Sequence, residues 1–120
     1  MFVARYPEWI AGARFADGGG AVFDGAKDMF KFWFEPDRWL PARRREDVKA
    51  LFVTDYYSLE QVDARAALFV LGSDVFGPMG RELVPFATRE DAEEFQRDHR
   101  GVRILGFDEV TEQIVRALDG

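Results

Sequence analysis

Met79 is the residue of this chain best suited to soft-metal chemistry, and it lies in a glycine-rich loop between two apolar runs. The runs span 68–71 and 83–86, and the residues that interrupt the sequence between them are Gly72, Gly77, Pro78 and Gly80. A thioether is a soft ligand that favours Cu(I) over Zn²⁺ or Ca²⁺. It is also an unbranched apolar group that fills irregular gaps in a core. The loop therefore leaves two interpretations of Met79, a hydrophobic plug or a copper ligand.

The other candidate ligands are few. The chain has one histidine, His99, and no cysteine, which excludes thiolate zinc sites, multi-histidine sites, disulfides and cysteine nucleophiles. His99 ends a predicted helix, where an imidazole satisfies the helix dipole; metal ligation is the alternative. Three carboxylates, Asp24, Asp55 and Asp74, stand where caps and turns use them, so none is assigned to acid–base catalysis.

Composition narrows the class of protein further. The chain has 120 residues, 48% of them apolar, which is enough for one domain with a substantial core. A net charge of −6 argues against a nucleic-acid partner, which needs a basic face. The basic run 43–45 is interpreted as a solvated loop, with a docking patch as the alternative. No apolar run approaches the ~18 residues of a membrane span, and no motif for nucleotide phosphates is present.

The elements that must position Met79 follow from local patterns. Runs 9–15 and 21–24 predict a hairpin around the turn 17–20, which is rich in glycine. Apolar residues at helical spacing predict a helix over 25–34, capped by Asp24 and ended by Glu35 and Pro36. Strands are predicted over 48–54 and 66–71, with a polar connection at 58–63.

After the glycine loop, a strand is predicted over 82–86. Thr88 predicts the cap of a helix over 89–99, with Ala92, Phe95 and His99 on one face and Gly101 as its C′ residue. A strand over 102–105 and a closing helix over 107–118 follow, the helix turning Val110, Ile114, Ala117 and Leu118 inward. Each half, about 1–54 and 55–120, then reads β-β-α-β. The predicted fold is one α+β domain over 1–120, made of duplicated ββαβ units with mixed sheets, helices on one side and a C-terminal helix.

Four stretches in order resemble the NosL family of nitrous oxide reductase accessory lipoproteins. They are MFVARYPEW (1–9), FDGAKDMFKFWF (23–34), DYYSLEQVDARAALFVLGSDVFGPMGREL-PF (55–86), and AEEFQRDHRG with the following ILGFDE (92–109). The segments DYYSLE and GSDV-GPMG are the specific ones. The resemblance implies a periplasmic, lipid-anchored Cu(I) metallochaperone that serves nitrous oxide reductase or its maturation machinery in denitrification. It also implies a duplicated ββαβ fold similar to that of organomercurial lyase.

The chain departs from the family pattern at two ligand positions. In the family the opening Met follows a Cys-Gly pair, which is absent before Met1, and GPMG is followed by His, where Arg81 stands here. Arginine has no lone pair for a metal. The resemblance thus assigns copper to Met79, with Met1 and His99 as further candidate ligands. Two functions follow: a Cu(I) chaperone whose site an upstream cysteine or a partner completes, or a metal-free module that docks a partner through the glycine loop. An enzyme is not expected, because the chemistry of the lyase fold needs cysteine nucleophiles.

Overall fold

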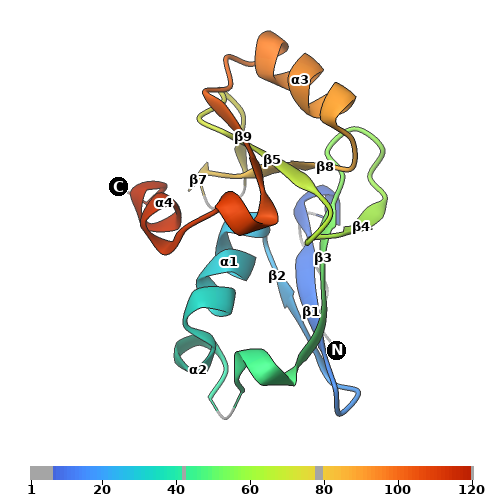
Figure 1. Cartoon of the computed structure of the whole chain (residues 1–120), viewed down its shortest axis with the longest axis vertical. Coiled ribbons are helices and arrows are strands. Elements are labelled where there is room, and N and C mark those ends of the chain that lie inside the picture. Colours follow the sequence, from blue (N-terminus) through green and yellow to red (C-terminus); the bar gives the residue numbers. More distant parts are fainter. Residues whose placement is uncertain (1–6, 42, 78–79, 120) are drawn as a thin grey trace.

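The computed structural model of the chain describes residues 7–41, 43–77 and 80–119, which form antiparallel sheets with helices packed against them (Figure 1). The first elements are η1 (Pro7–Trp9), β1 (Ala11–Phe15), β2 (Gly20–Phe23), α1 (Ala26–Phe34), α2 (Pro36–Trp39), η2 (Arg45–Asp47), β3 (Val48–Thr54) and β4 (Gln61–Asp63). The later elements are β5 (Leu68–Leu71), β6 (Phe76–Gly77), β7 (Gly80–Arg81), β8 (Val84–Phe86), α3 (Arg89–Asp98), β9 (Arg103–Gly106), η3 (Phe107–Glu109) and α4 (Glu112–Ala117).

The first sheet has the strand order β2-β1-β3-β4, and its hairpin was predicted correctly. Asp17 accepts a hydrogen bond from the Gly19 N–H at 2.9 Å, and Gly18 takes φ +94°, a conformation that favours glycine. Strand β4 lies within the segment predicted as a polar connection, and it pairs with β3 at the edge of the sheet. Only Val62 of its three residues is half-buried, so the segment carries too little apolar pattern to reveal a strand.

The second sheet has the order β8-β5-β9, and every strand pair described in either sheet is antiparallel. The prediction of mixed sheets was therefore wrong. In the first sheet β1 lies between β2 and β3, and in the second sheet β5 lies between β8 and β9. The two strands on either side of each central strand run parallel to each other, but the central strand separates them. Both faces of the second sheet are covered by apolar contacts, in contrast to the prediction of helices on one side: Phe69 and Leu105 join the core with α1, whereas Val70 and Phe86 pack with α3.

The helices correct three details of the prediction. The N-cap of α1 is Gly25, not Asp24. Thr88 caps α3 as predicted, accepting from the Asp91 N–H at 3.2 Å, but the left-handed residue after this helix is Arg100 (φ +60°) and not Gly101. A Cβ at Gly101 would lie 2.5 Å from Val70, so this glycine is needed for close packing. The predicted closing helix is broken into η3 and α4, because Thr111 caps α4 anew.

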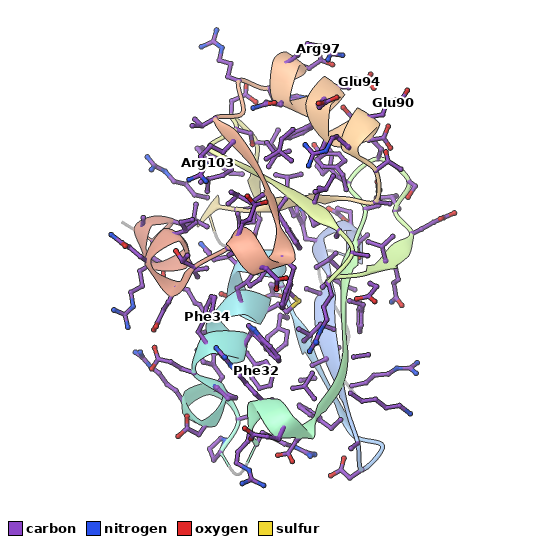
Figure 2. All side chains as sticks on the ribbon, in the orientation of Figure 1. Phe32, Phe34, Glu90, Glu94, Arg97 and Arg103 are labelled. Atoms are coloured by element: carbon purple, nitrogen blue, oxygen red, sulfur yellow. The ribbon has the colours of Figure 1, made fainter. Side chains whose placement is uncertain are left out.

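The core is rich in phenylalanine, and α1 contributes much of it. Phe30 and Phe32 are fully buried, and Phe30 meets Phe69 and Phe107 with ring centroids 5.2 and 5.3 Å apart. Helix α3, in contrast, carries charged residues on its outer face, where Glu90, Glu94 and Arg97 point away from the sheet (Figure 2).

The basic run 43–45 is more structured than the predicted solvated loop. Arg43 lies 4.1 Å above the Phe15 ring and donates to Asp17 at 2.9 Å. Arg45 donates to the Trp33 carbonyl at 2.6 Å. Two of the three guanidinium groups therefore bind the rest of the fold, which favours a structural role over a docking patch.

Candidate functional site

The glycine segment, defined here as residues 72–82, contains a short pair of antiparallel strands. Strands β6 and β7 pair Phe76 with Arg81 and Gly77 with Gly80, whereas no regular strand was expected at this place. Gly80 has φ +95°, which a side chain rarely tolerates. Residues 78–79 connect the two strands in sequence. Met79 and Met1 both lie outside the described residues, so their predicted roles are untested.

His99 is brought to the start of the glycine segment. Its Nδ1 lies 3.0 Å from Oδ1 of Asp74, and its carbonyl accepts from the Asp74 N–H at 2.9 Å. The imidazole also stacks on Phe95 with 4.5 Å between centroids. An ionised carboxylate can only accept a hydrogen bond, so Nδ1 carries the proton and a neutral ring keeps its lone pair on Nε2. This arrangement suits a metal ligand as well as a structural histidine. We call the Asp74–His99 pair the entry contact.

Glu82 holds the other end of the glycine segment. Its side chain is 4% exposed, and Oε1 accepts from the N–H groups of Lys27 at 2.6 Å and of Leu83 at 2.9 Å. Lys27 is the second residue of α1, and the first N–H groups of a helix need acceptors from outside it. Glu82 thus provides the carboxylate cap that the sequence assigned to Asp24. We call this arrangement the exit contact.

Gly25 leaves the space that the exit contact occupies. A Cβ added at Gly25 would overlap Oε2 of Glu82. The φ of Gly25 is −179°, extended backbone that any residue adopts, so space and not backbone geometry requires glycine here. Gly25 and Glu82 are therefore complementary in shape.

Burial sets the electrostatics of the exit contact. Removal from water raises the pKa of Glu82 to about 7, against the hydrogen bonds from Leu83 and Lys27 and the charge of Lys27. Lys27 is itself 2% exposed, and its Nζ lies 3.3 Å from Oδ1 of Asp119. Burial also raises the pKa of Asp28 on the same helix turn. Burial of the Glu82 carboxyl thus favours its protonated form.

An apolar groove of about 480 Å³ lies between the glycine segment, the end of β5, Val102 and α4. Phe76 and Val102 line it and are 63% and 67% exposed, which is unusual for large apolar side chains. The remaining lining residues are Leu71, Gly72, Ser73, Arg81, Glu82, Ile114, Ala117 and Leu118. The groove therefore places exposed apolar surface directly beside the segment that carries Met79.

Comparison with known proteins decides the family. The NosL family model matches residues 1–115 of the chain. The chain belongs to the NosL family. The comparison with curated proteins finds no match.

Two solved NosL structures have the same fold. One is the crystal structure of the copper chaperone NosL from Shewanella denitrificans, with a TM-score of 0.77 and 25% identity over 94% of this chain and 86% of that one. The other is the solution NMR structure of the apo-NosL protein from Achromobacter cycloclastes, with a TM-score of 0.61 and 21% identity over 88% and 87%. The resemblance to the NosL family that the four sequence stretches indicated is confirmed.

The family's motif positions can now be placed on this NosL-family fold. Arg81, at the position that the resemblance gives to histidine, is exposed on β7 and lines the apolar groove. No group of three His, Cys, Asp or Glu side chains within the described ranges is arranged to hold a metal. No helix in the described part of the chain is long and apolar enough to cross a membrane.

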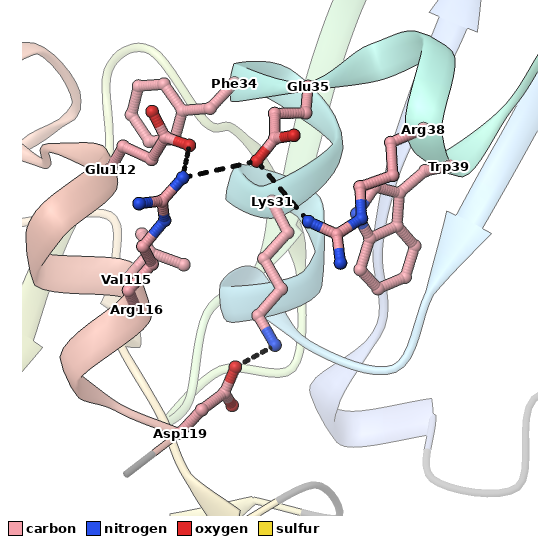
Figure 3. A pocket seen from close by; sticks show the side chains of 9 residues that line it. All are labelled: Lys31, Phe34, Glu35, Arg38, Trp39, Glu112, Val115, Arg116 and Asp119. Carbon is pink, nitrogen blue, oxygen red and sulfur yellow. Dashed lines mark hydrogen bonds and ion pairs between the residues drawn. The ribbon is translucent and has the colours of Figure 1, made fainter.

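A second hollow, of about 170 Å³, lies between α1, α2 and α4 and has a structural explanation (Figure 3). Arg116 bridges Glu112 at 2.8 Å and Glu35 at 3.7 Å, and Lys31 pairs with Asp119. The dashed contacts of Figure 3 join these charges to one another across the hollow. The charges thus bind α4 to α1, so the hollow is not a candidate site.

Asp55 and Glu82 show what the sequence could and could not reveal. Asp55 accepts from the N–H groups of Tyr57, Ser58 and Ala87, as its predicted turn role requires. Glu82 was missed, because its partner Lys27 lies 55 residues away. The local sequence offers Gly25 before the helix, and a glycine does not identify the distant carboxylate.

Proposed function

We propose that this chain is a periplasmic Cu(I)-binding accessory protein that delivers copper for assembly of the copper centres of nitrous oxide reductase. The observation that carries the proposal is the glycine segment, whose paired strands flank residues 78–79 and whose two ends are fixed by the entry and exit contacts. Membership of the NosL family and likeness to a copper chaperone of that family support it.

Copper is the cargo, and Met79 is its principal ligand. His99 is a candidate second ligand because the entry contact leaves Nε2 of the neutral ring free for coordination. Met1, or a cysteine upstream of it with a lipid anchor, would supply the remaining donor. Binding and delivery of a soft ion need no catalytic group, so we propose no enzymatic activity.

A Cu(I) competition titration with a colorimetric chelator tests the proposal. The wild-type chain should bind about one equivalent, and Met79→Leu should lower the affinity at least tenfold because it removes the thioether. Met29→Leu is the matched control, since Met29 is a fully buried core residue and the swap conserves volume. Equal affinities of wild type and Met79→Leu would remove Met79 from the site.

The second candidate function is a metal-free module that docks a partner, and the apolar groove beside the glycine segment favours it. Absence of Cu(I) binding by wild type, with binding created by Arg81→His, would support this candidate. The partner proposed under either function is nitrous oxide reductase or its maturation machinery.

We also propose that the halves, about 1–54 and 55–120 of a single domain, descend from one duplicated ββαβ unit. The orders β2-β1-β3 and β8-β5-β9 support this, since the first strand is central in both. Superposition of the halves on each other and on organomercurial lyase tests both the duplication and the similarity in fold. Unlike strand orientations in the superposed halves would reject the duplication.

A further inference from the structure

We propose that Glu82 is a positioning residue for the copper-carrying hairpin: it fixes the end of β7 to the first turn of α1. This inference rests on the proposed function for its importance, but its geometry is independent of copper. One oxygen, Oε1, accepts hydrogen bonds from the N–H of Lys27 in α1 and from the N–H of Leu83, the next residue in the chain. The backbone of Glu82 follows directly on Arg81, whose partner in the hairpin is Phe76. A single side chain therefore links the hairpin to the core helix.

Burying a carboxyl costs free energy, so the burial of Glu82 indicates that its oxygen is needed as a hydrogen-bond acceptor. An isolated carboxyl is expensive to remove from water, and Glu82 is 4% exposed. Elsewhere in the core an apolar side chain fills such a place: Leu83, the next residue, is fully buried. Replacing Glu82 by a similar apolar group would leave two buried N–H groups without their acceptor, which is the costly case for hydrogen bonds.

Gly25 provides independent support for the contact. The three atoms that a Cβ at this position would approach most closely all belong to the Glu82 side chain, namely Oε2, Cδ and Oε1. The Glu82 carboxyl therefore requires a small residue at position 25. Both residues thus fit the contact: Glu82 provides the carboxyl that caps α1, and Gly25 leaves the space that this carboxyl occupies.

Glu82 lies close in sequence to Met79, the proposed copper ligand, and should therefore affect the glycine segment that carries it. Only Gly80 and Arg81 separate it from Met79 in sequence, and both are held in β7. If the exit contact is lost, the side-chain contact that remains at the other end of the segment is the entry contact, whose side chains are 53% and 36% exposed. Loss of Glu82 should therefore loosen the hairpin without removing any proposed copper ligand.

The test compares Glu82→Leu with Glu82→Gln, in which an amide oxygen still accepts both N–H groups. In the metal-free chain, hydrogen exchange at the amides of Gly80, Arg81 and Lys27 should rise at least tenfold in Glu82→Leu and stay near wild type in Glu82→Gln. The Cu(I) affinity should fall at least tenfold in the first variant and recover in the second. Glu109→Leu is the control, because Glu109 caps the Gly106 N–H at 2.8 Å far from the hairpin in sequence.

Gly25→Ala keeps the test open if Glu82→Leu does not fold. The added Cβ displaces the carboxyl, so this variant should show the same faster exchange at Gly80 and Arg81, whereas Gly106→Ala, whose Cβ meets nothing closer than 3.4 Å, should not. Wild-type exchange at the hairpin amides in both Glu82→Leu and Gly25→Ala overturns the inference. Faster exchange in a chain that binds no Cu(I) upholds the positioning role and rejects the proposed function instead.

Discussion

The entry and exit contacts fix the same segment by opposite physical means. The entry contact joins two partly exposed side chains, Asp74 and His99, at 3.0 Å. The exit contact joins a buried carboxyl to two backbone N–H groups. Exposed pairs contribute little, since water and salt compete for them, whereas a buried acceptor cannot be replaced by water. The rigidity of the glycine segment is therefore expected to come from its exit.

The largest effect should follow from Glu82→Leu. The change leaves the Lys27 and Leu83 N–H groups buried without an acceptor, at about 1–3 kcal/mol each, so the free energy of unfolding at pH 6 should fall by about 4 kcal/mol. Urea denaturation followed by tryptophan fluorescence measures it. A loss below about 1 kcal/mol would show that the exit contact is no stronger than the entry contact.

The next effect is a pH dependence that comes from the exit contact. Burial raises the pKa of Glu82 from 4.5 to about 7, so the folded state holds this proton more tightly than the unfolded state. The resulting stability, about 3 kcal/mol, is fully present below pH 4.5 and is lost as pH rises through 7. Lys27 and Asp28 face the carboxyl and modulate its pKa.

Comparison with Glu82→Gln isolates this part of the pH profile. The difference in unfolding free energy between wild type and Glu82→Gln should change by about 3 kcal/mol in favour of Gln between pH 4.5 and 8. Carboxyls that do not interact with Glu82 titrate alike in both proteins and cancel in the difference. Parallel profiles of the two proteins would mean that Glu82 keeps an ordinary pKa in the folded chain.

The smallest effect should come from the entry contact. Asp74→Asn keeps the backbone bond to the His99 carbonyl and weakens only the exposed side-chain contact, so the unfolding free energy should fall by less than about 1 kcal/mol. Denaturation at low and high salt measures it, with Glu60→Gln as an exposed control. A loss comparable to that of Glu82→Leu would reverse the ranking of the two contacts.

The same comparison shows which parts of the structure the sequence could predict. The 17–20 turn, strand β3 and the Thr88 cap follow from neighbouring residues, and each was predicted correctly. The cap of α1 was assigned to Asp24 by the same local rule, but its carboxylate comes from Glu82, across the fold. Gly101 was likewise assigned the left-handed position, which Arg100 occupies in the structure. The glycine is instead required by its close contact with Val70.

For the candidate site, the sequence indicated the family and the position of the glycine segment. It did not predict the entry and exit contacts that fix this segment to the rest of the fold. His99 was predicted on one face of α3 as a helix-end residue, with ligation as the alternative, yet its pairing with Asp74 joins α3 to a loop 25 residues earlier. No periodic pattern encodes such a pair. Tertiary contacts between polar groups distant in sequence are the part that a single chain does not reveal.

The fit of Gly25 to Glu82 has a consequence for engineering and for natural variation. A larger residue at position 25 displaces the Glu82 carboxyl, and a smaller residue at 82 opens a space that position 25 can fill. The two sites should thus be inherited or mutated as a pair, and a library that varies either one alone will recover mainly the parental residues. Randomising both together is the way to reach chains in which α1 and the glycine segment are coupled by different chemistry.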